Sequence, residues 1–330
     1  MKKSFVTPIM ERLAKNAGIK IVVEPRYGYV AQITTRRGRK RYMRNTSFDI
    51  NPLGAAEIAK DKAYSYFFLS GMGYPVPEGD AFFSPRWSEA IGIGKDPEAA
   101  YRYALRLGFP VMVKPNSLSQ GWGVTKVHNK REFMQAVRAI CKKDKVFLVQ
   151  RVVSGHDYRV VVLDNQIISA YERLPLSVTG DGRSTILGLL KQKQRQFEAV
   201  GRDTIINVDD QRIVNRLRRQ GFAKSSVLPK GKRVELLDNR NLSTGGDALD
   251  VTDSMHPSFR KLCIKITRDM GLRYCGVDLM VDGELSSSVK KYAVLEVNAA
   301  PGLDHYASVG RRQRELVDQM YLKVLMALAQ

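Results

Sequence analysis

Val294-Leu295-Glu296-Val297-Asn298, read together with Gly276-Val277-Asp278-Leu279, is the part of the sequence that says most about this chain. Both runs are short and mostly apolar, so we expect two buried strands. Alternate residues of a strand share a face, which places Glu296 and Asn298 together and lets Asp278 join them from the other strand. Two carboxylates and an amide suit Mg²⁺ or Mn²⁺, whose remaining ligands are usually water and nucleotide phosphates. The pattern therefore predicts a metal–nucleotide enzyme.

Two edge strands with polar ends would explain the same residues. For an isolated acid, or for a single Glu-x-Asn, that simpler explanation would be preferred. Glu296 argues against it, because it stands between Leu295 and Val297 at a position that would otherwise belong to the core. An ionised carboxylate is costly there unless it is paired or bound to a metal.

The composition is that of a globular protein with a substantial core. The chain has 330 residues, of which 44% are hydrophobic and 26% charged, and two or three subdomains are expected. No apolar run approaches the length of about 18 residues that a membrane span needs, and the N-terminus lacks the apolar stretch of a signal peptide. We expect a cytoplasmic protein with no membrane partner. The three cysteines have no metal-ligand spacing and are expected to be buried thiols.

The net charge of +21 predicts attraction to anions such as nucleotides, acidic substrates or nucleic acid. The densest basic run, residues 36–44, follows the alternating segment Tyr29-Val30-Ala31-Gln32-Ile33, and Gly38 stands where a tight turn is needed. A solvated basic hairpin is favoured over a nucleic-acid arm, so no nucleic-acid partner is expected.

Residues 1–50 are expected to form a small N-terminal module and residues 51–310 the main domain. Within the main domain, a helix over 52–71, capped by Asn51, precedes a compact strand–loop–strand–helix–strand subdomain at about 95–150. Two long strands at 158–163 and 166–173 follow. Residues 181–235 form a basic, partly helical insertion, and residues 311–330 a C-terminal helix.

A glycine-bearing loop follows Lys114, which ends an apolar strand. The loop reads Asn116-Ser117-Leu118-Ser119-Gln120-Gly121-Trp122-Gly123. Small residues let backbone N–H groups close over phosphate oxygens, while the lysine supplies a point charge. The sequence has no GxxxxGK[ST] motif, which excludes a Walker-type NTPase. Taken on its own, this loop is a weak signal, and a plain hairpin is the preferred explanation.

The motifs carry more weight as an ordered series than singly. The series runs Asp61-Lys62, Lys114 with its loop, Gln150-Arg151-Val152, Asp157-Tyr158-Arg159-Val160, Glu172-Arg173-Leu174-Pro175, Gly180-Asp181-Gly182, Asn241-Leu242-Ser243-Thr244-Gly245-Gly246, Asp250-Val251-Thr252-Asp253, Asp278 and Glu296-Val297-Asn298. This order resembles the ATP-grasp superfamily of carboxylate–amine ligases. It is most similar to the ATP-grasp domain of cyanophycin synthetase, and glutathione synthetases share it more loosely. The resemblance implies an α+β ATP-grasp fold, in which two α+β subdomains grip ATP, and makes the 95–150 subdomain the lid.

The resemblance also implies roles for individual residues, with ATP and Mg²⁺ or Mn²⁺ as cofactors. ATP would be bound by Lys62, Lys114, Ser119, Gly121, Gly123, Gln150, Val152 and Asp157. Metal ions would be held by Asp278, Glu296 and Asn298. Charge on the γ-phosphate and the incoming carboxylate would be neutralised by Arg159, Arg173 and Arg240. Substrate would be bound by Asn241, Ser243, Gly245 and Gly246. One departure concerns Gln150, which stands where the family commonly has an acid at the adenine hinge.

Each residue also has a simpler explanation. Arg159 and Arg173 could be salt-bridge partners within strands, and the segment 241–246 could be an ordinary turn. The functional explanation is preferred because it accounts for the whole order at once.

The resulting hypothesis is an ADP-forming ligase that joins an amino acid or short peptide to an amine through an acyl phosphate. Dimers are common among such ligases, but the sequence leaves a homodimer and a monomer equally open. A first alternative is ligation onto a peptide or protein terminus, with the basic hairpin docking an acidic partner. A second is a non-catalytic nucleotide-binding protein whose surface binds anions or nucleic acid. The intact acids Asp278 and Glu296 argue against the second alternative.

Overall fold

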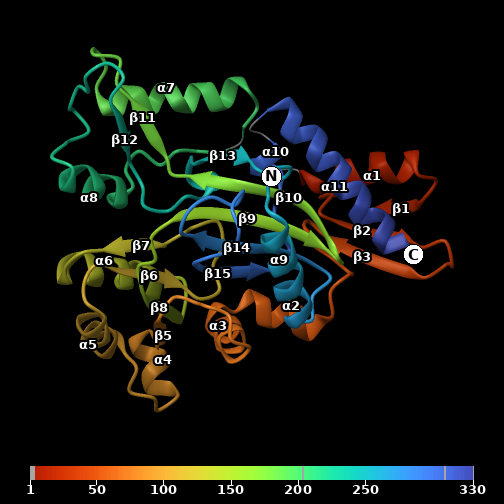
Figure 1. Ribbon diagram of the computed structural model, residues 1–330, viewed down its shortest axis with the longest axis horizontal. Coiled ribbons are helices and arrows are strands. Elements are labelled where there is room, and N and C mark those ends of the chain that lie inside the picture. Colours follow the sequence, from red (N-terminus) through yellow and green to blue (C-terminus); the bar gives the residue numbers. More distant parts are fainter. Residues whose placement is uncertain (1–3, 203, 308–309, 330) are drawn as a thin grey trace.

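The computed structural model describes residues 4–202, 204–307 and 310–329. Its centre is an antiparallel five-stranded sheet in the order β13-β10-β9-β14-β15 (Figure 1). The strands are β13 (Asp247–Asp250), β10 (Gln166–Leu174), β9 (His156–Leu163), β14 (Tyr274–Val281) and β15 (Tyr292–Asn298). The two strands predicted to carry metal ligands, β14 and β15, are therefore neighbours in one sheet.

The two faces of this sheet have different partners. On β9, Tyr158, Val160 and Val162 pack in a core with helices α2 (Leu53–Lys60) and α9 (Pro257–Asp269). Val161 belongs to a second core on the opposite face, because successive strand residues alternate. Arg159 lies on this second face, since it is two residues from Val161. The second face thus carries apolar residues at one end of the strand and charged residues at the other.

The N-terminal module covers the apolar end of the second face. It consists of α1 (Val6–Asn16) and a sheet of β1 (Lys20–Val23), β2 (Val30–Thr34), β3 (Lys40–Arg44) and β4 (Ser47–Phe48). Helix α11 (Arg311–Ala329) lies beside α1 and shares its core (Figure 1). Phe48 packs edge-to-face on Tyr274 and Tyr321, with ring centroids 5.9 and 6.0 Å apart. Module and C-terminal helix, far apart in sequence, therefore form one packed layer.

The subdomain predicted to be the lid is a second α+β unit. Its antiparallel sheet has the order β5-β8-β6-β7 and is built from β5 (Gly79–Phe83), β6 (Val111–Pro115), β7 (Thr125–Val127) and β8 (Val146–Arg151). Helices α5 (Pro97–Leu107) and α6 (Lys130–Cys141) pack on this sheet through a core that includes Phe133 and Phe147. The short helix α4 (Pro85–Ala90) follows β5. Strand β5 was not predicted, and it brings residues before position 95 into the lid sheet.

The basic insertion has a hydrophobic core of its own. It contains α7 (Ile186–Ala199), α8 (Gln211–Arg219) and β12 (Arg233–Glu235), and β12 pairs with β11 (Ser177–Thr179), which lies just before the predicted bounds of 181–235. Ile186, Leu190, Ile213 and Leu217 are buried together between its helices and its two-stranded sheet. A 3₁₀ turn, η1 (Leu242–Thr244), and a short helix, α10 (Asp304–Ala307), complete the described elements. None of the helices in the described ranges could cross a membrane.

The single helix predicted over 52–71 is wrong. It is broken at Asp61 into α2 and α3 (Lys62–Gly71), because Asp61 takes an extended conformation and caps α3 by accepting the backbone N–H of Tyr64 at 2.9 Å. Asn51 is not the cap of α2, which begins after Pro52. Its side-chain amide instead donates to the backbone oxygen of Tyr274 at 2.7 Å and so ties the chain to the central sheet.

Candidate active site

A cleft of about 530 Å³ is lined by the lid, the charged end of the central sheet and the insertion. Most predicted site residues line it: Lys62, Lys114, Ser119, Gly121, Gln150, Val152, Asp157, Arg159, Arg173, Arg240, Asn241, Ser243, Asp278, Glu296 and Asn298. Residues from both halves of the sequence thus meet in one place, as the ordered series of motifs implies.

Three predicted glycines lie outside the cleft lining, and close packing or a positive φ explains why each is a glycine. A Cβ atom on Gly246 would lie 2.5 Å from a backbone oxygen of β10. Gly245 has a φ of +95°, and Gly123 has a φ of +70°. Both conformations favour glycine, whatever is bound nearby. These three glycines do not line the cleft in this structure, and their contacts with substrate or nucleotide stay predictions.

The predicted metal ligands are neighbours across β14 and β15. Asp278 lies opposite Glu296, and Gly276 lies opposite Asn298. A β-bulge follows, because Leu279 pairs with Val294 rather than with Leu295. The bulge lets consecutive residues of β15, Leu295 and Glu296, both line the cleft. Strand alternation therefore gathers the three polar side chains, and the bulge adds an apolar one.

Arginines hold the Asp278 carboxylate from two sides. Arg159 donates to both carboxylate oxygens at 2.6 and 2.7 Å, and Arg173 donates to one of them at 3.0 Å. Burial alone would raise the pKa of Asp278, but the two guanidinium groups outweigh it and hold the pKa below its usual range. Arg173 also binds Asp157, through contacts of 2.6 and 3.0 Å. Burial raises the pKa of Asp157 despite that partner.

Glu296 is the more accessible carboxylate of the pair, with 26% of its side chain exposed, against 3% for Asp278. It forms an ion pair with Lys62 at 3.2 Å. Its oxygen also accepts the Asn298 amide at 3.2 Å, in the orientation in which Asn298 accepts from Arg159 at 3.0 Å.

The donor set fits a hard divalent cation, because every ligand atom it offers is oxygen. No cluster of three or more His, Cys, Asp or Glu side chains suited to a metal occurs in the described ranges. A cation in this cleft would therefore be held by two carboxylates and the Asn298 amide. Arg159 and Arg173 supply the positive charge around Asp278 in this structure.

Two buried lysines approach the same region from separate elements. Lys62, the first residue of α3, donates to the backbone oxygens of Asn116 and Leu118 at 3.2 and 3.0 Å. Lys114 of β6 donates to the hydroxyl of Tyr66, which in turn donates to the backbone oxygen of Leu295. Burial lowers the pKa of Lys114 to about 7, so this lysine is poised between its charged and neutral forms near neutral pH.

Tyr66 was missed in the sequence analysis. It lies four residues after Lys62 on α3, and residues at that spacing share a helix face. That spacing is the signal that could have identified it. Tyr66 connects the lid lysine to the β15 bulge, and its ring lies 4.7 Å from the Lys114 ammonium.

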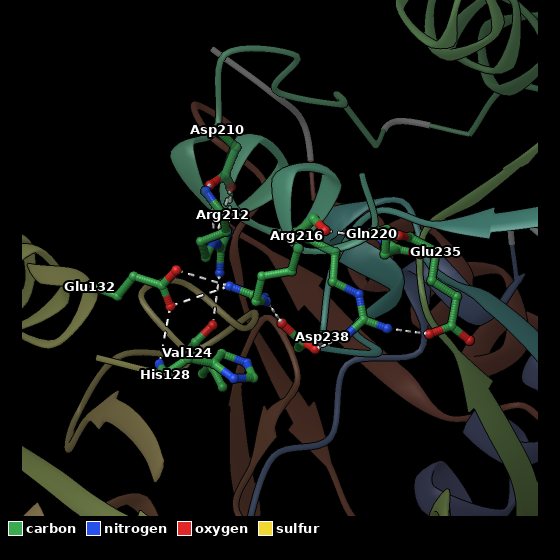
Figure 2. A network of polar contacts seen from close by, with 10 residues as sticks. Val124, His128, Glu132, Asp210, Arg212, Arg216, Gln220, Glu235 and Asp238 are labelled. Carbon is green, nitrogen blue, oxygen red and sulfur yellow. Dashed lines mark hydrogen bonds and ion pairs between the residues drawn. The ribbon is translucent and has the colours of Figure 1, made fainter. Parts of the chain in front are cut away.

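The arginines of α8 were also missed, and they dock the insertion against the lid (Figure 2). Arg219 pairs with Glu132 of α6 at 3.1 Å and with Asp238 at 3.1 Å. Arg216 pairs with Asp238 as well, and with Glu235 at 2.8 Å. The insertion thus bridges the lid and the segment that leads into the Asn241 motif.

Comparison with known proteins agrees with this arrangement. A model described as D-ala D-ala ligase C-terminus matches residues 68–180, and one described as RimK-like ATP-grasp domain matches residues 232–313. The glutathione biosynthesis bifunctional protein GshAB of Mannheimia succiniciproducens is 32% identical over 275 residues, which cover 79% of this chain and 34% of that protein. Cyanophycin synthetase of Trichormus variabilis is 32% identical over 266 residues, covering 79% of this chain and 28% of that protein.

A solved structure, the bifunctional glutathione synthetase from Pasteurella multocida, matches 98% of this chain and 44% of its own, with a TM-score of 0.59 and 24% identity. At that identity the match is evidence for the fold alone, and it confirms the predicted α+β ATP-grasp fold. The chain spans only about a third of the length of the curated relatives named above. The family models, the relatives and the cleft agree, and this chain belongs to the ATP-grasp superfamily.

Proposed function

We propose that this chain is an ATP-dependent ligase that joins a carboxylate of an amino acid or short peptide to an amine and releases ADP. The observation that carries the proposal is the meeting of two buried lysines with Asp278, Glu296 and Asn298 in one cleft. Burying charged groups costs free energy, and a protein that shared the fold without binding a ligand would gain nothing from these charges.

The charge of the cleft supports an anionic ligand. Of the described residues that line it, eight are lysine or arginine and five are aspartate or glutamate. The basic residues outnumber the acidic ones by three, so the net charge of the lining is positive. A positive, partly buried cleft attracts polyanions such as nucleotide phosphates.

Lys62, Lys114 and the loop 116–123 would bind the phosphates of ATP. Asp278, Glu296 and Asn298 would hold Mg²⁺ or Mn²⁺, which supplies charge stabilisation to the transferred phosphoryl group. Arg240 lines the cleft and donates to the backbone oxygen of Gly155 at 2.9 Å. Within the described ranges it forms no ion pair, so it is the arginine we assign to the incoming carboxylate.

The chemistry needs no protein nucleophile. A carboxylate oxygen of the substrate attacks the γ-phosphorus, the bond to the β–γ bridging oxygen breaks, and ADP leaves. The amine nitrogen then attacks the acyl carbon and loses a proton, and inorganic phosphate leaves as the amide forms. The protein's part is to align these groups and to stabilise the negative charge that develops.

A peptide or protein terminus is the second candidate acceptor. Thr46, in the turn between β3 and β4, lines the cleft and donates to the backbone oxygen of Ala300 at 3.2 Å. The basic N-terminal module therefore reaches the cleft itself. An acidic peptide on this module would lie close to the reaction centre.

The test is release of ADP and phosphate from Mg²⁺-ATP across a panel of amino acids, dipeptides and acidic peptides, singly and in pairs. Glu296→Ala is the inactivating variant. Glu57→Ala is the matched control, because it removes an exposed carboxylate whose partner is Lys60 of the same helix. Turnover that needs both an acid and an amine, and that only Glu296→Ala abolishes, supports the ligase. ATP binding without turnover for any pair would favour the non-catalytic alternative.

A further inference from the structure

The glycine loop of the lid is held by side chains from outside the lid. Ser243 donates to the backbone oxygen of Gln120 at 2.9 Å, and Asn239 donates to that of Gly121 at 3.2 Å. Arg212 donates to the backbone oxygens of Gly121 and Val124 at 3.0 and 3.1 Å. The carbonyl groups of the loop are therefore fixed by the C-terminal half of the chain.

Fixing a carbonyl also fixes the amide of the same peptide group, because the two point in opposite directions in a trans peptide. The Gly121 N–H is thus directed away from Ser243. Within the described ranges, the backbone N–H groups of Ser119, Gln120 and Gly121 have no acceptor. These residues line the cleft, so their amides are available to an anionic ligand.

Arg212 is itself held in place before it reaches the loop. Its guanidinium contacts both oxygens of Asp210, at distances from 2.6 to 3.0 Å. Asp210 also caps α8 by accepting the Arg212 backbone N–H at 2.9 Å. Figure 2 shows this pair at the start of α8, with the arginine directed toward Val124. A guanidinium fixed in this way loses little further freedom on binding the two carbonyl groups.

We propose that Arg212 is a positioning residue for the nucleotide phosphates: it holds the loop 119–124 in the conformation whose amides receive them. The inference rests on the proposed function, because it takes ATP as the ligand. It assigns a role to the basic insertion, which binds the lid loop through Arg212 of α8. Two distant parts of the chain would then form the phosphate site together.

The experiment compares binding of AMP and of a non-hydrolysable ATP analogue, with Mg²⁺, to the full chain and its variants. For Arg212→Ala we expect the analogue to bind about tenfold or more weakly, whereas AMP binding changes less than about twofold. KM for ATP should rise in parallel. Arg212→Lys should recover part of the loss, because an ammonium can still donate to one carbonyl group.

Arg218→Ala is the matched control, since Arg218 lies exposed on the same helix. Equal loss of AMP and analogue binding in Arg212→Ala would mean a merely structural role and would overturn the inference. So would unchanged analogue binding. If Arg212→Ala does not fold, AMP and analogue binding are compared in Arg212→Lys, and an equal loss of both would again overturn the inference. Failure of the unmodified protein to bind ATP would instead overturn the proposed function.

Discussion

Binding of ATP should take up a proton from solvent at mildly alkaline pH. Lys114 is 8% exposed, and its ammonium contacts the Tyr66 hydroxyl rather than a carboxylate. Burial lowers its pKa to about 7, so at about pH 8 roughly nine-tenths of the molecules hold Lys114 neutral. A phosphate group beside the lysine favours the charged form and raises the pKa again. Each binding event at about pH 8 should therefore take up about 0.9 proton.

The same shift sets the pH dependence of affinity. Because the nucleotide prefers the protonated lysine, the association constant for Mg²⁺-ATP should fall about tenfold for each pH unit above about 7, or ~1.4 kcal/mol per unit. Below that pH the lysine is already charged, and the affinity should level off.

Isothermal titration in two buffers of different ionisation enthalpy measures the proton uptake directly. Lys114→Met is the control, since it removes the titrating group while keeping an unbranched side chain. The reasoning is refuted if the binding enthalpy is the same in both buffers, or if Lys114→Met takes up as much proton as the unmodified protein.

Other predictions separate stability from function. Asp278→Asn should destabilise the fold by about 3 kcal/mol in urea unfolding, because the buried Arg173 and the partly buried Arg159 both lose this carboxylate. Glu296→Gln should cost less than about 1 kcal/mol, and both variants should abolish turnover. Gly121→Ala should weaken ATP binding, since its Cβ would lie 2.7 Å from a neighbouring side chain at a φ of +68°. Gly38→Ala, at a φ of +79° with open space around it, should lose only stability. Tyr66→Phe should lower the free energy of unfolding by about 1–3 kcal/mol, because the buried Lys114 loses the hydroxyl to which it donates. Urea unfolding should show the loss most clearly below about pH 7, where Lys114 is charged.

The central features of the site could be predicted because they follow from local rules. The alternation of β15 places Glu296 and Asn298 together, and an apolar partner strand supplies Asp278 opposite them. The hairpin around Gly38 was confirmed for a similar reason, since β2 and β3 pair directly and the glycine takes a positive φ.

Features that depend on long-range contacts could not be predicted. At the break, Asp61 accepts the local capping bond from Tyr64 and a second bond from the Asn116 amide at 2.7 Å. Asn116 is far away in the sequence, so a helix pattern over 52–71 does not show this second bond. Gly245 lies close to Leu176 and Ile206, and Gly246 lies close to the backbone of Leu174, contacts that the turn-like sequence does not indicate. The layer formed by the N-terminal module and α11 joins the two ends of the chain, which no periodicity can indicate.

The arginines of the site show why the simple and the functional explanations do not exclude one another. Arg159 and Arg173 are salt-bridge partners in this structure, as the simpler explanation has it, and the candidate metal ligand Asp278 is the partner that they share. A cation that binds Asp278 has to compete with both guanidinium groups. Arg159, once displaced, becomes available to an anion, whereas Arg173 keeps Asp157 as a partner. Metal binding and the recruitment of a γ-phosphate or carboxylate would then be coupled through one carboxylate. Without phosphate, the same competition should weaken the binding of the cation. Mg²⁺ alone should therefore bind in this cleft far less tightly than Mg²⁺ with ATP.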